Sequence, residues 1–280
     1  MIQTLTNKLK EVIVVNQQRI NAYVKWHLLA YIKSFVRNND QTEAHLVIAF
    51  FKLLKPIRTD ITLQRIGEVN DGGYLVPSNL ENICGLISPG TGDTIRFDVD
   101  LTNGSIPGVL IDGSVEPPKD LPKNLNFLKK YVGSSGEEHV TLSEIIETYF
   151  PKCNDLILSM DIEGGEYEVL NSIQIDYLMK FRIIVIELHY LNKILNAHEY
   201  FKVVEPNVNK LLDNFYILHL HCNNGGGYFY LRGMKFPRVI ELTLIRKDCV
   251  KNIFGFAKLP HILDAPNIKG VKDARLPRCI

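Results

Sequence analysis

The sequence of 280 residues predicts an α/β fold built on a mostly parallel β-sheet. From Thr62 onwards, short runs rich in Val, Ile and Leu alternate with glycine-containing turns and with stretches of helical spacing, a pattern typical of buried parallel strands joined by helices. Before that point, residues 6–54 contain neither glycine nor proline and are expected to be helical. We therefore expect a helical N-terminal extension, residues 1–56, and one larger domain, residues 57–280.

Seven apolar runs are candidate strands. Between the first five there is room for crossover helices, so we expect these strands to be parallel. The last two are joined by a glycine-rich, aromatic loop without a helical pattern, so we expect them to form an antiparallel pair. In chain order, the candidate strands are residues 83–88, 108–112, 124–132, 155–161, 183–189, 215–221 and 239–246.

Three other segments complete the predicted fold. Apolar residues recur at helical spacing around Ile20, Tyr23 and Val24, which predicts two or three helices that serve as a cap or an oligomer contact, with a membrane-surface helix as the alternative. Residues 93–104 alternate like a strand, but their position between two strands predicts a helix. The tail after Cys249 is irregular and proline-containing, and we expect it to wrap back over the domain.

Composition excludes several classes of protein. The formal net charge of +1 gives no general attraction for polyanions, so nucleic acid is not an expected partner. The five cysteines are scattered and lack CxxC spacing, which argues against a disulfide framework or a zinc site and favours the cytoplasm. There is no signal-peptide pattern, and the most apolar stretch, residues 45–54, is short and contains Lys52, so we expect no membrane span.

A glycine pair follows the first candidate strand and indicates a cofactor site. Gly90 and Gly92 lie in "SPGTGD", where the lack of side chains lets a ligand approach the backbone. Asp112, followed by Gly113, ends the next strand, where an acid can bind ribose hydroxyls. The third glycine of a NAD fingerprint is replaced by Ile95. These residues predict an adenosine-bearing cofactor, the alternative being loop glycines beside a capping Asp.

Two further turns are candidate cofactor contacts. "NDGGYLV" places Asp71, Gly73 and Tyr74 in a tight turn just before the first strand, although a bare turn would need no function. "LKKYVGSSGE" ends the third strand, and Ser134 lies where the backbone can meet an adenine edge.

Ionisable residues end three later strands. Asp161 follows the fourth strand, Glu187 and His189 share one face at the end of the fifth, and His219 and His221 do so in the sixth. Carboxyl ends of strands form the ligand crevice of open α/β sheets. The group predicts either a general base, His189 or His221, or a divalent metal site at Asp161, Glu187 and His189. A lone strand-end His is more often structural, and we interpret Glu163 and Glu166 as helix-capping acids.

The order of these motifs resembles the FkbM-type S-adenosylmethionine-dependent methyltransferases. The resemblance spans roughly Thr62 to Asn267, and "DIEGGEY" is its most specific part. It implies a Rossmann-like, seven-stranded class I methyltransferase sheet with one antiparallel strand, Gly90 and Gly92 in the first cofactor motif, and Asp112 at the ribose. Many relatives methylate hydroxyls of sugars or polyketides. The motifs are "DGGYLV", "SPGTGDTIRFD", "IDGS", "TLSEII", "LILSMDIEGGEYEVL", "IIVIELHYL", "HLHCNN", "VIELTLIRKD" and "LPHILDAPN".

The predicted function is therefore methyl transfer from S-adenosylmethionine to a hydroxyl of a sugar, glycan or related small molecule. A hydroxyl needs a base, or a metal such as Mg²⁺ or Mn²⁺, to become nucleophilic. Two alternatives stay open: an NAD(P)-dependent oxidoreductase on a similar sheet, and a non-catalytic methyltransferase-like binding protein. A homo-oligomer formed through the N-terminal helices is a further expectation.

Overall fold

The computed structural model describes residues 40–92, 94–134, 136–278 and 280. The helices predicted before residue 40 lie outside these residues. Its elements in chain order are α2 (Ala44–Leu53), β1 (Ile57–Thr59), β2 (Leu63–Gly67), β3 (Gly73–Pro77), β4 (Gly85–Pro89), α3 (Arg96–Thr102), β5 (Gly108–Ile111), β6 (Leu125–Leu128), β7 (Tyr131–Val132), β8 (His139–Val140), α4 (Leu142–Tyr149), β9 (Leu156–Met160), α5 (Glu166–Ser172), α6 (Ile175–Leu178), β10 (Phe181–Leu188), η1 (Leu191–Leu195), α7 (Ala197–Glu199), η2 (Tyr200–Val204), α8 (Glu205–Asn214), β11 (Phe215–Cys222), β12 (Tyr228–Leu231), β13 (Met234–Pro237), β14 (Ile240–Arg246), η3 (Lys247–Cys249) and β15 (Ile253–Phe256).

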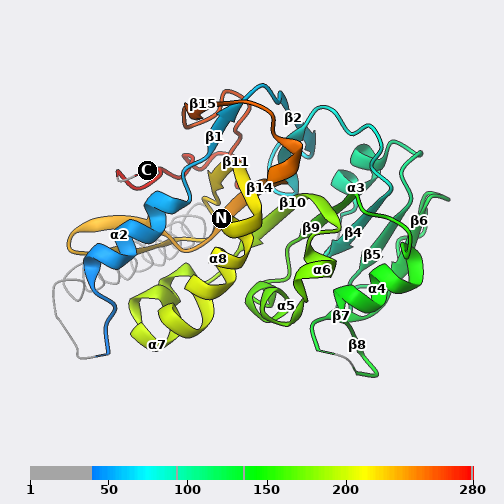
Figure 1. Ribbon diagram of the computed structural model, residues 1–280, viewed down its shortest axis with the longest axis horizontal. Helices are drawn as coiled ribbons and strands as arrows, with labels where there is room; N and C mark the ends of the chain where they lie inside the picture. Colours follow the sequence, from blue (N-terminus) through cyan, green and yellow to red (C-terminus); the bar gives the residue numbers. More distant parts are fainter. Residues whose placement is uncertain (1–39, 93, 135, 279) are drawn as a thin grey trace, which may run out of the picture.

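Seven strands of the described chain form one sheet in the order β11-β14-β10-β9-β4-β5-β6 (Figure 1). Each of the seven predicted runs supplies one of these strands. β14 is antiparallel to both of its neighbours, β10 and β11, whereas the other neighbouring pairs are parallel. The predicted α/β fold, with a mostly parallel seven-stranded sheet and one antiparallel strand, is confirmed. The expected antiparallel pair also forms, but β14 is inserted between β10 and β11.

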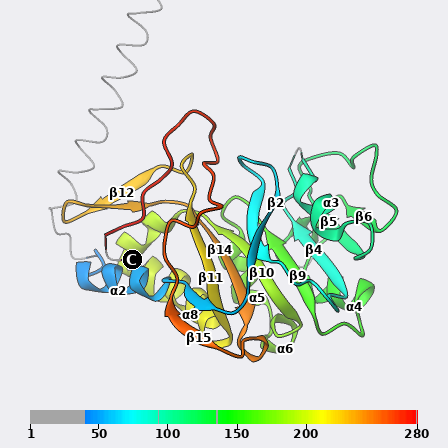
Figure 2. The same ribbon diagram turned by 90° about the horizontal axis from the view of Figure 1, so that it is seen from above.

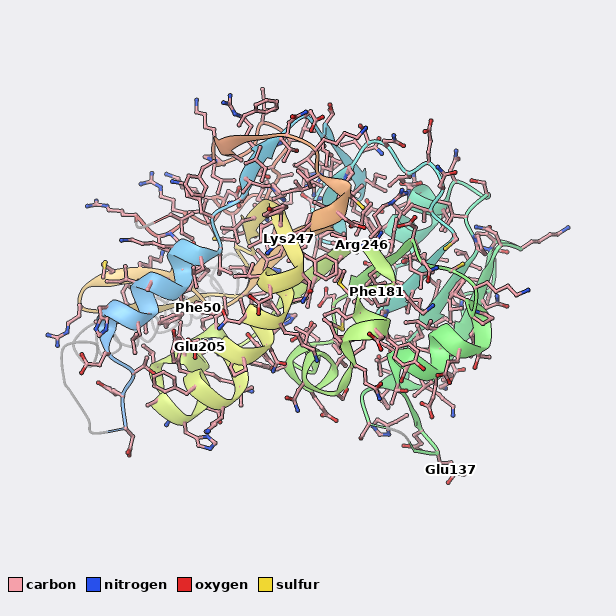
Figure 3. All side chains as sticks on the ribbon, in the orientation of Figure 1. Phe50, Glu137, Phe181, Glu205, Arg246 and Lys247 are labelled. Atoms are coloured by element: carbon pink, nitrogen blue, oxygen red, sulfur yellow. The ribbon has the colours of Figure 1, made fainter. Side chains whose placement is uncertain are left out.

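Both faces of this sheet are covered. Every residue of β4, β5 and β9 is buried, as expected for continuous apolar runs in a parallel sheet. On one face, apolar residues of α2, α4, α5 and α8 form the main core (Figures 1 and 2). Figure 3 marks two of its aromatic side chains, Phe50 of α2 and Phe181 of β10. The described part of the N-terminal extension thus packs into the core of the sheet domain.

The other face is covered by α3 and the β2–β3 hairpin. Residues 93–104 contain the predicted helix, although their alternating pattern suggested a strand. Phe97 and Leu101 lie one helical turn apart and are both buried in the second core, where the Phe97 ring packs 5.1 Å from that of Tyr74. The helix ends at Asn103, which adopts a left-handed conformation with φ 44°.

The C-terminal tail returns over the sheet, as predicted. Its strand β15 pairs with β1, which the irregular sequence did not indicate, and the following residues cross above β11 and β14 (Figure 2). Within the described residues no helix is both long and apolar enough to cross a membrane.

The two ends of the parallel strands have different surroundings. Arg246, at the end of β14 (Figure 3), donates to the carbonyls of Asn154 and Met179 and pairs with Asp155. These contacts hold the segments that precede β9 and β10, at the amino-terminal ends of the parallel strands. The carboxyl ends of the parallel strands lie on the opposite side of the sheet, where ligands bind in folds of this type.

Candidate active site

A cavity of about 340 Å³ opens at the carboxyl ends of β9 and β10. Asp161, Glu187 and His189 all line it, so the structure brings together three of the residues predicted from the strand ends. The complete lining is Asp71, Asp161, Glu163, Glu187, His189, Tyr190, Asn223, Gly225, Gly226, Arg238, Val239, Asn267 and Ile268.

His189 follows β10, and both its imidazole ring and its backbone carbonyl make contacts. Its Nδ1 lies 3.0 Å from Oε1 of Glu166, and its backbone carbonyl accepts a hydrogen bond from the Tyr167 hydroxyl at 3.0 Å. Its Nε2 lies 3.4 Å from Glu163 and 3.8 Å from Asp161. Burial lowers the pKa of His189, but the hydrogen bond and charge of Glu166 outweigh burial, so the pKa is raised.

For Glu166 the sequence predicted only a helix-capping role. It begins α5, as predicted, yet its side chain is 0% exposed. Its Oε1 accepts the backbone N–H groups of Ile162 and Gly164 in addition to facing His189. An acid in the first turn of a helix is ordinarily solvent-facing, and nothing in the local sequence distinguishes this buried one. Glu166 therefore joins the loop after β9 to the imidazole.

The first glycine of "DIEGG", Gly164, allows this loop to pack. Gly164 has φ +109°, and a side chain there would overlap the Tyr190 ring, at 2.4 Å from its nearest atom. Tyr190 itself adopts a left-handed conformation with φ 54°, which places it on the cavity wall directly after His189. The motif thus shapes one wall of the cavity.

Asp161 presents an unsatisfied oxygen at the end of β9. Its Oδ2 accepts a hydrogen bond from the Tyr74 hydroxyl at 3.3 Å, whereas its Oδ1 is buried without a hydrogen-bond partner. Burial raises the pKa of Asp161 to about 7, although His189 acts in the opposite direction. Tyr74, predicted as a cofactor contact, lies against this carboxylate. A buried oxygen without a partner suits a ligand donor or cation.

Glu187 is held by a residue that the sequence did not single out. The Asn223 side-chain amide donates to its Oε1 at 2.7 Å. Burial, followed by the charges of Asp161 and Glu241, raises the pKa of Glu187 to about 10. Glu187, a member of the predicted metal set, has its Oε1 3.7 Å from Nε2 of His189. Among the described residues, however, the donor group that lies within 4.8 Å consists of Asp161, Glu163 and His189.

His221 does not reach this cavity. Its Nδ1 faces Glu241 at 3.2 Å and its Nε2 faces Asp273 of the tail at 3.1 Å. The expectation that His221 lies beside His189 assumed adjacent strands, but β14 separates β11 from β10. His219 likewise contacts Asp264 of the tail at 2.7 Å. In the structure, these two histidines fasten the tail to the sheet.

The tail also contributes to the cavity wall. Asn267 donates to Oε1 of Glu241 at 2.6 Å and to Oδ1 of Asp71 at 3.1 Å. Asp71, a predicted cofactor contact in the turn before the first strand, lines the cavity and contacts the C-terminal segment through Asn267. Gly73 of the same turn is required by packing, since a side chain there would overlap the carbonyl of Glu68.

The predicted cofactor residues form a second, neighbouring group. The N–H of Gly92 donates to Oδ2 of Asp112 at 2.9 Å, and the backbone N–H of Ser114 donates to its Oδ1 at 2.8 Å. Burial raises the pKa of Asp112, but hydrogen bonds from Ser114 and Gly92 outweigh it, so the pKa is lowered. The glycine loop and the strand-end acid are thus joined, as expected for one binding site.

The glycines of this group have different roles. A side chain at Gly90 would lie 1.6 Å from the Asp161 carbonyl, so this glycine lets the ends of β4 and β9 meet. A side chain at Gly92 would meet nothing within 4 Å, so Gly92 borders open space that can accommodate a ligand. Gly113 packs under the Tyr131 ring, and Ser134 is exposed beyond β7, outside the cavity lining.

Comparison with known families identifies a matching segment. Residues 103–206 match the model described as the methyltransferase FkbM domain. Asp112, Asp161, Glu166 and His189 lie inside this segment, whereas Gly92 precedes it. A search of curated proteins gave no match.

Proposed function

Because residues 103–206 match the methyltransferase FkbM domain, the family that the motifs resemble, we propose that the protein is an S-adenosylmethionine-dependent O-methyltransferase. When bound, S-adenosylmethionine supplies a methyl group activated by its sulfonium. The backbone N–H of Gly92 donates to Asp112, and the open space beside Gly92 can accommodate part of the cofactor. Both observations support a cofactor site at this loop. The cavity beside His189 is then the acceptor site.

The single observation that carries the proposal is the placement of His189. An aliphatic hydroxyl is too weakly acidic to react unaided, so a base must remove its proton. With the Nδ1 proton directed at Glu166, Nε2 is the nitrogen that faces the cavity acids and accepts the proton from an acceptor hydroxyl. The carboxylate of Glu166 stabilises the imidazolium that results, while Asp161 can accept a hydrogen bond that orients the acceptor.

The same residues fit a divalent cation. Mg²⁺ or Mn²⁺ is held by carboxylate oxygens, and the partnerless Oδ1 of Asp161 lies close to donor atoms of Glu163 and His189. Bound there, the cation would supply a positive charge that lowers the pKa of a hydroxyl. The Glu163 side chain is 84% exposed, which makes it the weakest donor of the three, so we propose His189 as a base without a metal.

Methyl transfer tests this proposal directly. Purified protein is incubated with methyl-labelled S-adenosylmethionine and a panel of neutral and acidic sugars, and O-methyl products are detected by mass spectrometry. His189→Ala should lower turnover by roughly 10²-fold or more. His198→Ala, which removes an exposed imidazole outside the cavity, should retain wild-type turnover. Near-normal turnover of folded His189→Ala contradicts the assignment.

A chelator separates the two mechanisms. If His189 is the base, activity should persist in EDTA and follow the protonation state of a single histidine. Loss of activity in EDTA, with recovery on adding Mg²⁺ or Mn²⁺, would instead assign Asp161, Glu163 and His189 to a metal site.

A further inference from the structure

Arg238 is the arginine of a cavity whose polar lining consists mainly of acids and amides. It lies between β13 and β14, and its backbone is anchored on both sides: its N–H donates to the Gly227 carbonyl at 3.0 Å, and its carbonyl accepts from Leu191 at 2.9 Å. Its side-chain Nε donates to Oδ1 of Asn192 at 3.1 Å. The half-buried guanidinium is therefore fixed in position by segments that follow β10 and β11.

The terminal nitrogens of Arg238 lack partners within the described part of the chain. Neither nitrogen donates a hydrogen bond there, and no carboxylate forms an ion pair with the guanidinium. Arg246 shows the usual behaviour, since its guanidinium pairs with Asp155 and Asp248 and donates to two carbonyls. An arginine has five donors, and a half-buried guanidinium normally uses them. Arg238 retains most of its donors for another molecule.

Both acidic residues and Arg238 line the cavity. Carboxylates of Asp161, Glu163 and Glu187 lie around Nε2 of His189, at 3.4 to 3.8 Å. None of them forms an ion pair with Arg238, which lines the same cavity. One molecule can therefore present a hydroxyl to His189 and a negative group to Arg238.

We propose that Arg238 binds a carboxylate or phosphate carried by the methyl acceptor, so that the acceptor is an acidic sugar or a related polyhydroxy anion. This inference rests on the proposed function and specifies its substrate class. A guanidinium binds either anion through two parallel hydrogen bonds, which also sets the orientation of the bound molecule.

Calorimetric titration with three matched probes tests the inference: glucose, glucuronate and glucose 6-phosphate. At least one anion should bind the full-length protein about 10-fold or more tightly than glucose, the range for a charge-assisted contact, and the two anions separate carboxylate from phosphate recognition. Arg238→Gln should remove this preference, so that neither anion binds this variant more tightly than glucose does. Arg232→Gln, which removes an exposed charge from the turn of the same hairpin, should preserve it.

Three results overturn the inference: equal affinities for glucose and both anions, a preference that survives in Arg238→Gln, or no binding of either anion at millimolar concentration. S-adenosylhomocysteine is titrated into the same samples. Failure of that ligand to bind refutes the proposed methyltransferase function, whereas normal binding of it with no anion preference refutes only the role of Arg238.

Discussion

Oε1 of Glu166 lies 3.0 Å from Nδ1 of His189, and both side chains are buried. The pair joins the start of α5 to the end of β10, so the position of the imidazole depends on a helix that begins in the "DIEGG" loop. In the proposed mechanism Glu166 is a positioning residue, and His189 is the group that meets the acceptor.

Glu166→Gln should therefore weaken catalysis without unfolding the protein. The amide nitrogen would take the place of Oε2, which makes no hydrogen bond, so the shape is conserved. Because Glu166 raises the pKa of His189, its neutralisation should lower that pKa. The rate increases with pH as His189 loses its proton, so the acidic limb of the pH profile should shift to lower pH, while maximal turnover falls by roughly 10²-fold.

Glu168→Gln provides the matched control, since Glu168 is exposed in the same turn of α5. An unchanged acidic limb and unchanged turnover in Glu166→Gln would assign the residue to helix capping alone.

His221→Ala should affect stability rather than turnover. The imidazole lies between Glu241 and Asp273, and its removal leaves Oε2 of the buried Glu241 carboxylate without a partner, at a cost of about 1–3 kcal/mol. We expect a lower urea midpoint and faster proteolysis of the C-terminal tail, with turnover close to that of the wild type. A stable His221→Ala protein that has lost turnover would restore His221 as a catalytic residue.

Much of this fold could be predicted because local pattern and tertiary structure agree. Continuous apolar runs such as that of β9 are interpretable without the structure, since strands covered on both faces need apolar residues throughout. The position of β14 was not predictable from periodicity, because sequence order does not fix neighbour order. Because β14 lies between β10 and β11, His221 is separated from the site.

The site itself was predictable only in part. Asp161, Glu187 and His189 end neighbouring strands, so topology brings them together. Glu166, Asn223 and the tail contacts depend on long-range packing that leaves no local signal. Arg238 follows a hairpin strand with no feature to distinguish it from other surface arginines.

Asp98 makes stability depend on pH. It is buried in α3, and burial raises its pKa to about 7 against the effect of a hydrogen bond with Ser88. The folded protein therefore holds this proton more tightly than the unfolded chain, whose Asp titrates near pH 4. This contribution to stability is complete below about pH 4 and decreases as pH rises to about 7.

Asp98→Asn should remove that decrease. The stability of Asp98→Asn relative to wild type should rise by roughly 1.4 kcal/mol per pH unit across this window and stay constant above it, as measured by urea unfolding. Asp100→Asn, on the same helix, removes a partly exposed ion pair with Arg96 and should change stability by about 0.5 kcal/mol or less. A difference that does not vary with pH would show that Asp98 is ionised in the folded state.

The two loop glycines should respond differently to alanine. Gly90→Ala would overlap the Asp161 carbonyl and should greatly reduce folded protein. Gly92→Ala has open space around it and a left-handed φ of +55°, so about 1–2 kcal/mol of strain is expected. Thermal unfolding and S-adenosylhomocysteine titration should show a folded Gly92→Ala protein with weakened ligand binding. Full affinity in this variant would place the ligand elsewhere.

Binding of S-adenosylhomocysteine, measured by calorimetry, tests the central claim most directly because it requires no knowledge of the acceptor. The wild-type protein should bind this ligand and show no binding of NAD or NADP. Asp112→Ala should weaken the interaction by about 10-fold or more, as expected for loss of a charge-assisted contact. Binding of NAD in place of S-adenosylhomocysteine, or equal affinity in wild type and Asp112→Ala, would contradict the account.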